Sequence, residues 1–363
     1  MAKRVSVDKW MFTVTLLLVF IGLVMVFSAS AVMAKERFGS PYGFLVRQMA
    51  WAAAGLVAMV VIMNVNYKNF RKPTVVFTFL GFTSLLLIAV FFFRDSHNTH
   101  RWIKFGGFSL QPSELAKPAL ILYLAYFLES RWQAITDVKN VLLPAVAPTL
   151  LFCLLIVKEP DLGTALACMA ISTAVLYVAG MNMRYLWAGA IASLVPLYFL
   201  IVRVPWRWAR MQAYLDPFKD PQGKGFHIIQ SMIAVSTGGL TGLGLMEGKQ
   251  KLFYLPEPHT DFIFAVTAEE LGLWGSVLVV SLFGIFLYRG VRTALRTEDM
   301  FGKFLATGIT AMVVVQALFN ISVVLALVPA KGIPLPFISY GGSSLFITLA
   351  TVGVLLNVSQ QAE

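Results

Sequence analysis

The sequence predicts an all-α, polytopic integral membrane protein with about ten transmembrane helices. Of its 363 residues, 58% are hydrophobic and 13% are charged, and the mean hydropathy is +0.76, which is far more apolar than a soluble domain. A spanning helix needs about 20 mostly apolar residues. Such runs begin near Trp10, Phe44, Thr74, Leu115, Val141, Leu162, Tyr185, Leu271, Phe304 and Ser343. The fourth, sixth and tenth runs are short or interrupted, so eight or nine spans are the alternatives.

Ten spans place both termini on one side of the membrane, and the charges predict that this side is the cytoplasm. Lys and Arg are more numerous in the short segments on the N-terminal side than in those on the other side, as in cytoplasmic loops. Lys3, Arg4 and Lys9 precede the first run, and Ser28 to Ala31 follow it, as in a cleaved signal peptide. The run is too long for that, so a retained helix is expected.

Composition also excludes several function classes. The net charge of +11 is spread in short basic clusters between apolar runs and forms no basic face, so no nucleic-acid partner is expected. Cys153 and Cys168 lie inside apolar runs without a second Cys or a His at ligand spacing, and both are predicted to be core residues. The sequence contains no nucleotide-binding loop, zinc motif or serine-hydrolase elbow, which argues against chemistry powered by ATP.

Residues 203–260 form one long extracytoplasmic loop within a single membrane domain of residues 1–363. Loops of this length are usually functional, and Arg210 in this loop is a candidate substrate-binding residue. The stretch from Tyr214 to Gly223 predicts consecutive turns. Helical spacing then predicts an amphipathic helix on the membrane surface, through Phe226, Ile229, Met232, Ile233 and Ser236.

Asp261 lies in the densest polar cluster, at the mouth of the eighth apolar run. An Asp at a helix start is either a plain N-cap or, in a suitable setting, a general base. The setting combines rigid, polar and water-excluding neighbours: Pro256, Pro258, His259, Thr260, Phe262 and Phe264. It favours the general base, with Glu257 and Asp161 as the next candidates.

Glu114 and Lys117 belong to a second cluster, which leads into the fourth apolar run. Their spacing of three residues places them side by side on a helix, where an internal ion pair is the simplest interpretation. The functional alternative is that Lys117, Arg101 and Arg47 line a cavity that receives a phosphate group, because ammonium and guanidinium groups bind such anions strongly.

Three further residues each have a structural interpretation. Trp102 is either an interfacial belt residue or a platform for sugar stacking, and the belt is the commoner case. Ser113 is expected to be the N-cap of the fourth helix, and Asp161, in the charged break from Lys158 to Thr164, to cap the sixth. The last cluster, from Lys331 to Ser344, is rich in Gly and small hydroxyl residues, which permit close backbone approach to a ligand or another helix.

These clusters, in this order, resemble the SEDS family (shape, elongation, division and sporulation), the polytopic glycosyltransferases that polymerise lipid II into peptidoglycan. The resemblance covers nearly the whole chain. Its most specific segments are Arg101-Trp102 with Gln111 to Lys117, Glu159 to Thr164, His259 to Phe264 with Glu269 to Gly272, and Ile338 to Ser344. Lys251 to Pro256, Asp220 to Gly223 and Lys331-Gly332 look more like the division branch, FtsW, than the elongation branch, RodA.

The resemblance implies an inverting glycosyltransferase in the bacterial cytoplasmic (inner) membrane, at the division septum. Lipid II would be the acceptor and the glycan strand on undecaprenyl pyrophosphate the donor, with Asp261 as the essential base. A class B penicillin-binding protein, a transpeptidase, and other divisome proteins are the implied partners. No metal-binding residue is assigned, and a role for Mg²⁺ or Mn²⁺ is left open. The candidate substrate-binding residues are Arg47, Arg101, Trp102, Glu114, Lys117, Asp161, Arg210, His259, Thr260, Ser339, Tyr340 and Gly341.

Two other classes of protein share part of this pattern. A lipid II flippase would also have many spans, intramembrane charges and helices broken by proline, but the sequence shows no inverted repeat, and its carboxylates cluster toward the outer face instead of the midplane. A noncatalytic scaffold for cell-wall enzymes would not need a carboxylate in a water-poor pocket.

Overall fold

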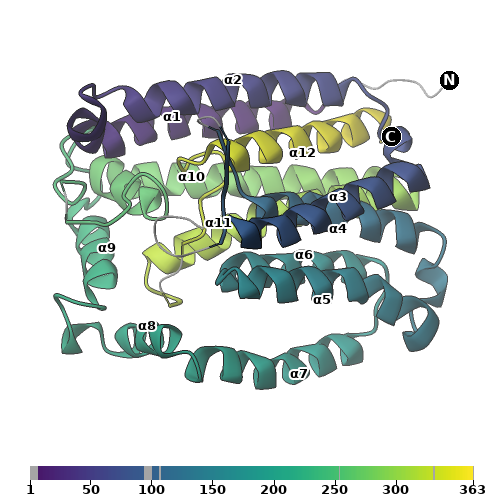
Figure 1. Ribbon diagram of the computed structural model, residues 1–363. Coiled ribbons are helices and arrows are strands. Elements are labelled where there is room, and N and C mark those ends of the chain that lie inside the picture. Colours follow the sequence, from purple (N-terminus) through teal and green to yellow (C-terminus); the bar gives the residue numbers. More distant parts are fainter. Residues whose placement is uncertain (1–6, 94–99, 106–107, 253, 330–331, 363) are drawn as a thin grey trace.

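Long apolar helices lie side by side along the molecule in the computed structural model (Figure 1), which describes residues 7–93, 100–105, 108–252, 254–329 and 332–362. Lys331 of the last cluster therefore lies outside the described residues. Each of the ten predicted apolar runs falls within one long helix. These helices are α1 (Lys9–Phe38), α2 (Gly43–Met63), α3 (Pro73–Ala89), α4 (Pro112–Glu129), α5 (Leu143–Lys158), α6 (Leu162–Val178), α7 (Met183–Val202), α10 (Ile263–Arg296), α11 (Met300–Val324) and α12 (Gly342–Gln361).

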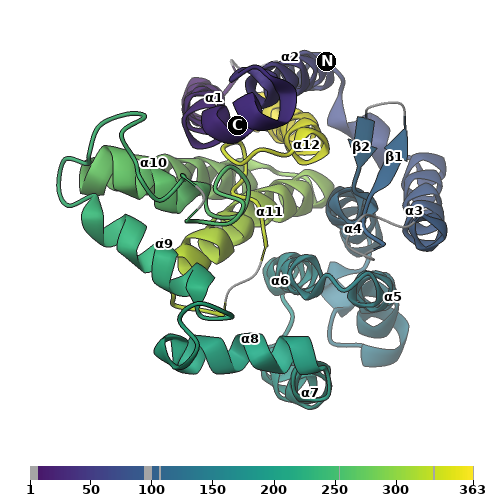
Figure 2. The same ribbon diagram turned by 60° about the vertical axis from the view of Figure 1, so that its left-hand side comes forward.

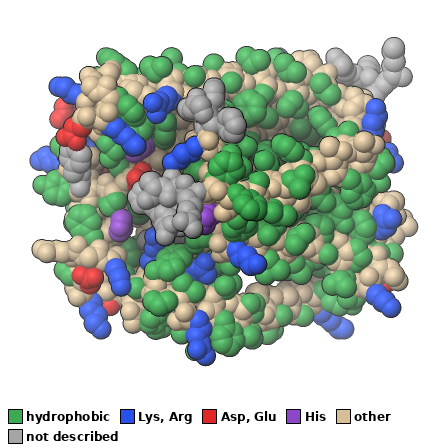
Figure 3. Space-filling model, in the orientation of Figure 1, with side chains coloured by type: hydrophobic (Ala, Val, Ile, Leu, Met, Phe, Trp, Pro, Cys, Tyr) green, Lys and Arg blue, Asp and Glu red, His purple; other side chains and the backbone are tan. Residues whose placement is uncertain are grey.

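Eight helices in the described part of the chain are long and apolar enough to cross a bilayer. The two long helices that fall short are α4, which carries Glu114, Lys117 and Glu129, and α6, which has 17 residues. The interpretation as a helical, polytopic membrane protein is confirmed, whereas the count of ten spans stays a prediction. Hydrophobic side chains cover most of the visible face right of the centre (Figure 3), where a lipid environment would lie.

The two ends of the described chain meet at one end of the bundle (Figure 1). The backbone N–H of Asp8 donates to Ser359 Oγ at 3.4 Å, and Gln361 Nε2 donates to Asn66 Oδ1 at 3.3 Å. The segment between α7 and α10 lies at the opposite end. An even number of crossings explains this arrangement, but the cytoplasmic position of the termini stays a prediction.

The long loop contains more regular structure than its sequence predicts. Helix α8 (Pro205–Leu215) and the 3-10 turn η5 (Pro217–Lys219) precede the amphipathic helix α9 (Phe226–Thr237). The predicted turns begin only after Leu215, so their expected start at Tyr214 is wrong by two residues. The expected helix from Phe226 is confirmed, but its buried residues are Ile228, Ser231 and Ala234, while Met232 and Ile233 are exposed.

Short elements connect the long helices. A two-stranded antiparallel hairpin, β1 (Ile103–Phe105) and β2 (Phe108–Leu110), precedes α4 and is a small exception to the all-α prediction. The remaining turns are η1 (Tyr67–Arg71), η2 (Val90–Phe92), η3 (Trp132–Ala134) and the π-helical η4 (Val138–Leu142). The hairpin follows Arg101 and Trp102 directly and so sets their position near the start of α4.

Helix α10 is broken at Gly272, whose φ of 65° and ψ of −159° suit glycine alone. A Cβ at Gly272 would lie 2.3 Å from the backbone nitrogen of Gly242, so the long loop packs directly into the break. Every residue from Ile263 to Glu270 is buried. The first part of α10 is therefore a fixed support for the turn that precedes it.

Two buried carboxylates hold the long loop to this part of α10. Glu269 Oε1 accepts a 2.8 Å hydrogen bond from the backbone N–H of Lys249, and Glu270 Oε2 accepts a 3.0 Å bond from that of Met246. Lys251 Nζ lies 2.5 Å from Glu270 Oε1. These glutamates stabilise the loop and are not free for chemistry.

Helix α7 stands apart from the rest of the bundle (Figure 2). It contains no buried residue, and its main packing partner is α8. The pair α7 and α8 therefore forms an arm that faces α5, α6 and the end of the bundle.

Candidate active site

Asp261 lies in the turn that leads into α10, and its side chain is partly buried. The N-cap position belongs to Phe262, and no side chain caps the helix, so the interpretation of Asp261 as a plain N-cap is wrong. The backbone carbonyl of Asp261 accepts a 2.8 Å hydrogen bond from Asn320 Nδ2 on α11. The same amide donates to Ile333 O at 2.8 Å. Asn320 thus joins the Asp261 turn to the segment before α12.

The Asp261 side chain lines a cavity of about 280 Å³. The other lining residues come from α8, α9 and the neighbouring loops: Arg210, Lys224, His227, Ile228, Pro256, Glu257, Phe262 and Gly332. A Cβ added at Gly332 would lie 2.3 Å from Asp261 Oδ2. The carboxylate therefore rests against a backbone position where only glycine leaves room.

The electrostatic setting of Asp261 favours proton transfer near neutral pH. Burial raises the pKa of Asp261 to about 6, and the negative charges of Glu257 and Asp161 act in the same direction. Arg101 and Arg210 partly oppose this rise in pKa. A carboxylate with this pKa is mostly ionised at neutral pH yet binds a proton more readily than an ordinary Asp, which suits a general base.

The segment before α12 holds the backbone of the Asp261 turn. Ser339 Oγ donates to Thr260 O at 2.6 Å and accepts a 2.8 Å bond from the N–H of Leu335. The N–H of Tyr340 donates to His259 O at 2.8 Å. Two predicted site residues, Ser339 and Tyr340, therefore act here as a clamp on two others, Thr260 and His259.

Gln48 on α2 completes this clamp, although the sequence analysis did not single it out. Its Nε2 donates to Ser339 O at 3.1 Å, and its Oε1 accepts a 3.3 Å bond from the N–H of Gly341. Its neighbour Arg47 points elsewhere: the guanidinium lies over the Phe38 ring, 4.6 Å from the centroid, and the side chain is exposed.

His259 is buried between two aromatic rings. Its ring centroid lies 4.6 Å from that of Phe44 and 5.6 Å from that of Tyr340. Burial lowers the pKa of His259, and although Glu257 opposes this change, the imidazole is neutral at pH 7. Its Nδ1 has no hydrogen-bond partner in the described part of the chain.

Glu257 presents a second carboxylate to the cavity. Its φ of 48° is unusual for a residue with a side chain. Thr260 Oγ1 lies 3.3 Å from Glu257 O and 3.4 Å from Glu257 Oε2 and can donate to either. Strained backbone of this kind persists where the surroundings hold it, often at functional sites.

Arg101 is positioned by the turn between α5 and α6. Its Nε donates to Glu159 O at 3.0 Å, and its Nη2 donates to Pro160 O. The side chain of Glu159, whose backbone carbonyl binds Arg101, is fully buried. Neither of its carboxylate oxygens has a hydrogen-bond partner among the described residues. Burial, followed by the charge of Asp161, raises the pKa of Glu159 to about 9, so this group is protonated at neutral pH. Trp102 follows Arg101 and is partly buried.

Asp161 caps α6, as the sequence predicts. Its Oδ1 accepts a 3.2 Å bond from the N–H of Thr164, and its Oδ2 accepts a 2.7 Å bond from Thr164 Oγ1 and a 3.4 Å bond from Gln111 Nε2. The expected N-cap at Ser113 is wrong: α4 begins at Pro112 after Gln111, and the Ser113 hydroxyl is buried within the first turn.

Glu114 and Lys117 form the ion pair that their spacing predicts. Lys117 Nζ lies 2.8 Å from Glu114 Oε2, and both side chains are almost completely buried. Ser344 Oγ of α12 donates to the same carboxylate oxygen at 2.8 Å. The cavity that Lys117, Arg101 and Arg47 are expected to line for a phosphate group stays a prediction.

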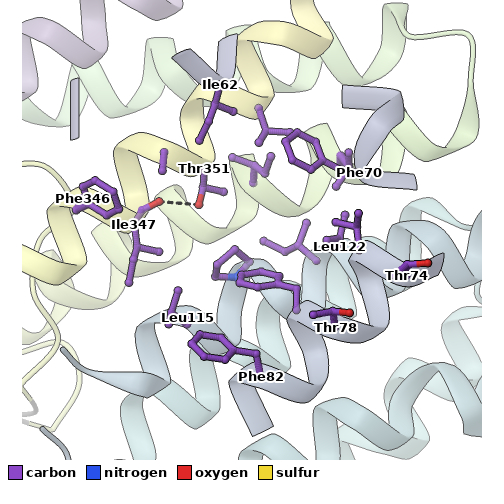
Figure 4. A pocket seen from close by; sticks show the side chains of 18 residues that line it. Ile62, Phe70, Thr74, Thr78, Phe82, Leu115, Leu122, Phe346, Ile347 and Thr351 are labelled. Atoms are coloured by element: carbon purple, nitrogen blue, oxygen red, sulfur yellow. Dashed lines mark hydrogen bonds between the residues drawn. The ribbon is translucent and has the colours of Figure 1, made fainter. Parts of the chain in front are cut away.

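A large apolar cavity of about 670 Å³ lies among α2, α3, α4, α11 and α12 (Figure 4). Phe82 of α3, Leu115 of α4 and Ile347 of α12 are among its lining residues. Leu115 lies between Glu114 and Lys117 in sequence. The shape and chemistry of this space suit a hydrocarbon chain.

Among the residues that the structure describes, no three His, Cys, Asp or Glu side chains are placed around one metal position. A role for Mg²⁺ or Mn²⁺ therefore stays a prediction.

The comparisons with known proteins agree with this fold. The model of the FtsW, RodA and SpoVE family, described as "Cell cycle protein", matches residues 8–363. Stage V sporulation protein E of Bacillus subtilis is 43% identical over 99% of this chain and 98% of its own length. A probable peptidoglycan glycosyltransferase FtsW of Geobacter metallireducens is 45% identical over 93% of this chain and 90% of its own length.

Two solved structures share the architecture. One chain, from work described as "Structural coordination of polymerization and crosslinking by a peptidoglycan synthase complex", has a TM-score of 0.80 and 30% identity, with 98% of each chain covered. The rod shape determining protein RodA of Thermus thermophilus has a TM-score of 0.72 and 28% identity, again with 98% of each chain covered. By sequence and by fold, this chain belongs to the FtsW, RodA and SpoVE family of cell cycle proteins.

Proposed function

We propose that this protein is a peptidoglycan glycosyltransferase, which polymerises lipid II into glycan strands at the outer face of the bacterial cytoplasmic membrane during cell division. The observation that carries the proposal is the Asp261 carboxylate, held in a cavity with a pKa of about 6. Relatives named as probable peptidoglycan glycosyltransferases, and a similar chain from a peptidoglycan synthase complex, support the reaction class.

In the proposed step, Asp261 takes the proton from the acceptor sugar hydroxyl of lipid II. The hydroxyl oxygen forms a bond to the anomeric carbon of the donor strand, and the bond from that carbon to the lipid diphosphate breaks. The proton remains on Asp261, and the diphosphate leaves with its lipid. Direct displacement inverts the anomeric carbon and needs no covalent enzyme intermediate. A role for Mg²⁺ or Mn²⁺ in this step stays an open proposal.

The other predicted site residues then divide into two groups. His259, Thr260, Ser339, Tyr340 and Gly341 position the Asp261 turn through the contacts described above. The remaining candidates, Arg47, Arg101, Trp102, Glu114, Lys117, Asp161 and Arg210, are proposed to contact the substrate or to support the residues that do. Of these, Arg210 lines the Asp261 cavity directly.

The proposed partners are the lipid-linked glycan strand, a class B penicillin-binding protein that supplies the transpeptidase, and other divisome proteins at the septum. A similar chain occurs in a complex that coordinates polymerisation with crosslinking, which supports a transpeptidase partner. The exposed, apolar surface of α7 and the eight candidate spans support a position in the membrane.

The test is to reconstitute the purified protein in liposomes, with and without the class B partner, and to look for glycan polymer made from lipid II. We expect polymer that depends on this protein and forms in greater amount with the partner. Movement of lipid II between leaflets without any polymer would instead identify a flippase, and the absence of both activities would identify a scaffold.

A further inference from the structure

Three successive backbone carbonyls hold the turn before α10. The carbonyls of His259 and Thr260 accept hydrogen bonds from the segment before α12. The third carbonyl, Asp261 O, accepts a 2.8 Å bond from Asn320 Nδ2. Asn320 belongs to α11, which packs against α10 along the bundle (Figure 2). It therefore ties the proposed base itself to a long helix.

Asn320 makes a second bond on the opposite side of the Asp261 carboxylate. The same amide nitrogen donates to Ile333 O at 2.8 Å. Ile333 follows Gly332, and a Cβ added at Gly332 would lie 2.3 Å from Asp261 Oδ2. One side chain thus fixes both the backbone that carries the carboxylate and the backbone that limits where the carboxylate can lie.

The Asn320 side chain is an unfavourable choice for the packing of α11 alone. It is 1% exposed, and its Oδ1 is buried with no hydrogen-bond partner within the described ranges. A buried amide oxygen without a partner costs free energy, and an apolar side chain would avoid that cost. Proteins keep such unsatisfied groups mainly where function requires them. The position of the turn, rather than the stability of α11, explains this residue.

We propose that Asn320 is a positioning residue, whose side-chain amide fixes the gap between the Asp261 turn and Gly332 and so holds the Asp261 carboxylate inside its cavity. This inference rests on the proposed function, because it explains how the general base is kept in place. Both bonds from Asn320 go to backbone oxygens. Asn320 therefore acts through Asp261 and takes no part in the chemistry itself.

The loss of both bonds would change the proton affinity of Asp261. The turn and the Gly332 segment could then separate, and the carboxylate could move toward water. Burial is the largest cause that raises the pKa of Asp261 to about 6. A carboxylate that leaves this setting should titrate closer to the ordinary Asp value of about 3.9.

The other groups that act on Asp261 stay in place when Asn320 alone is replaced. They come from its own loop and from segments before or within β1, α6, α8 and α9. The charged and titratable groups around Asp261 are Glu257, Asp161, Arg101, Arg210, Lys224 and His227. A lowered pKa in an Asn320 variant would therefore report a movement of the carboxylate.

The test follows the protonation of Asp261 in the purified full chain in detergent, by infrared difference titration. The Asp261 band is assigned by its loss in Asp261→Asn. Asn320→Leu keeps a side chain of similar size and removes both donors. We expect a midpoint of about pH 6 in the wild type and a midpoint about one pH unit lower in Asn320→Leu.

The rate of lipid II polymerisation is measured beside the titration. At neutral pH it should fall about 10²-fold in Asn320→Leu, because a displacement of about 1 Å in a catalytic group has such an effect. The acid limb of the rate should move to lower pH together with the titration midpoint. A variant that is only less well folded would lose rate without any change in the pH profile.

Gln316→Leu is the matched control. Gln316 lies one turn earlier on α11 and is 3% exposed, and among the described residues no hydrogen bond joins it to the Asp261 turn. This variant also replaces a buried amide by an apolar side chain, and it should keep the wild-type titration and rate. If Asn320→Leu does not fold, Asn320→Ser decides the question, because a hydroxyl has one donor hydrogen and cannot serve both carbonyls.

The results separate this inference from the proposed function, because the titration needs no lipid II. A wild-type or higher midpoint in a folded Asn320 variant would overturn the inference, and so would an equal shift in the Gln316 control. A lowered midpoint in a protein that makes no polymer would keep the positioning role and remove the glycosyltransferase proposal. Polymerisation with a wild-type titration in the Asn320 variants would do the reverse.

Discussion

Asp261 shows how a single carboxylate acquires a proton affinity suited to catalysis. Burial supplies the largest part of the rise in its pKa, and two other carboxylates add to it. The backbone of Gly332 then limits where the carboxylate can lie. Each of these influences can be changed by one substitution, so the proposed role of Asp261 can be tested at the level of single residues.

Gly332→Ala should impair polymerisation with little effect on stability. The new Cβ would lie 2.3 Å from Asp261 Oδ2, and the carboxylate must move. A displacement of about 1 Å in a catalytic group can cost about 10²-fold in rate. The assay is lipid II polymerisation beside thermal unfolding in detergent. Gly189→Ala on α7, where nothing lies within 4 Å, is the control and should retain full activity.

The pH dependence of the rate should report the pKa of Asp261. Because the base must be ionised, the rate should fall by about tenfold per pH unit below about pH 6, where Asp261 becomes protonated. Glu257→Gln removes a negative charge that raises this pKa, so its acid limb should move to lower pH. The shift should be small, because the Glu257 side chain is largely exposed and screened by water. An acid limb that stays in place, or moves to higher pH, would contradict this account.

The residues that the sequence analysis missed are uncharged or distant in sequence from their partners. Gln48 and Asn320 are polar residues inside apolar helices, and this is a signal that could have marked both. Their partners were beyond prediction, because Gln48 bonds to a carbonyl 291 residues away.

At the scale of elements, a buried ion pair on α4 contacts α12. Ser344 of α12 donates to the same Glu114 oxygen that Lys117 contacts. Lys117→Ala should therefore destabilise the fold by about 3–5 kcal/mol, because it leaves a buried carboxylate without its cation. It should also lower activity more than Lys104→Ala, since Lys104 is exposed on β1.

Thermal unfolding and polymerisation, measured on the same preparations, check this prediction. A double variant, Glu114→Gln with Lys117→Met, removes both charges and should recover part of the stability lost in Lys117→Ala. Equal losses in the Lys117 and Lys104 variants would show that the buried pair has no special role. Glu114→Gln alone should reduce stability as well.

Element boundaries followed from the sequence where apolar length decides them. All ten predicted runs are helical, because a long apolar segment in a membrane must satisfy its own backbone hydrogen bonds. Helix α8 was missed because its Trp and Arg residues resemble a loop. Helix α10, which contains the eighth predicted apolar run, begins at Ile263, before the predicted start of that run at Leu271. The break at Gly272 hid this start, since its geometry depends on the packing of the Gly242 segment.

For the whole molecule, the four sequence clusters meet at the end of the bundle opposite the termini. The clamp from the α12 segment, the turn before α6 and the long loop all contribute to the surroundings of Asp261. The sequence predicted which segments matter but not which of their residues touch, because those contacts join positions far apart in the chain.

The orientation of this site predicts the result of an accessibility experiment. Cys introduced at Gln222 should react with an impermeant reagent from the outside, and Cys introduced at Arg292 only from the inside. Gln222 lies in the segment between α7 and α10, and Arg292 near the other end of α10. The native Cys153 and Cys168 are replaced beforehand. Labelling of Gln222 only from the inside would overturn the topology and place the reaction on the wrong face.

The most direct measurement is the polymerisation rate of Asp261→Asn, taken with its thermal stability and its binding of lipid II. Asn keeps the size of the side chain but cannot accept the proton, so we expect a folded protein that binds lipid II and polymerises it about 10²- to 10⁴-fold more slowly than the wild type. Folded Asp261→Asn protein that polymerises lipid II within a few-fold of the wild-type rate would show that Asp261 is not the base.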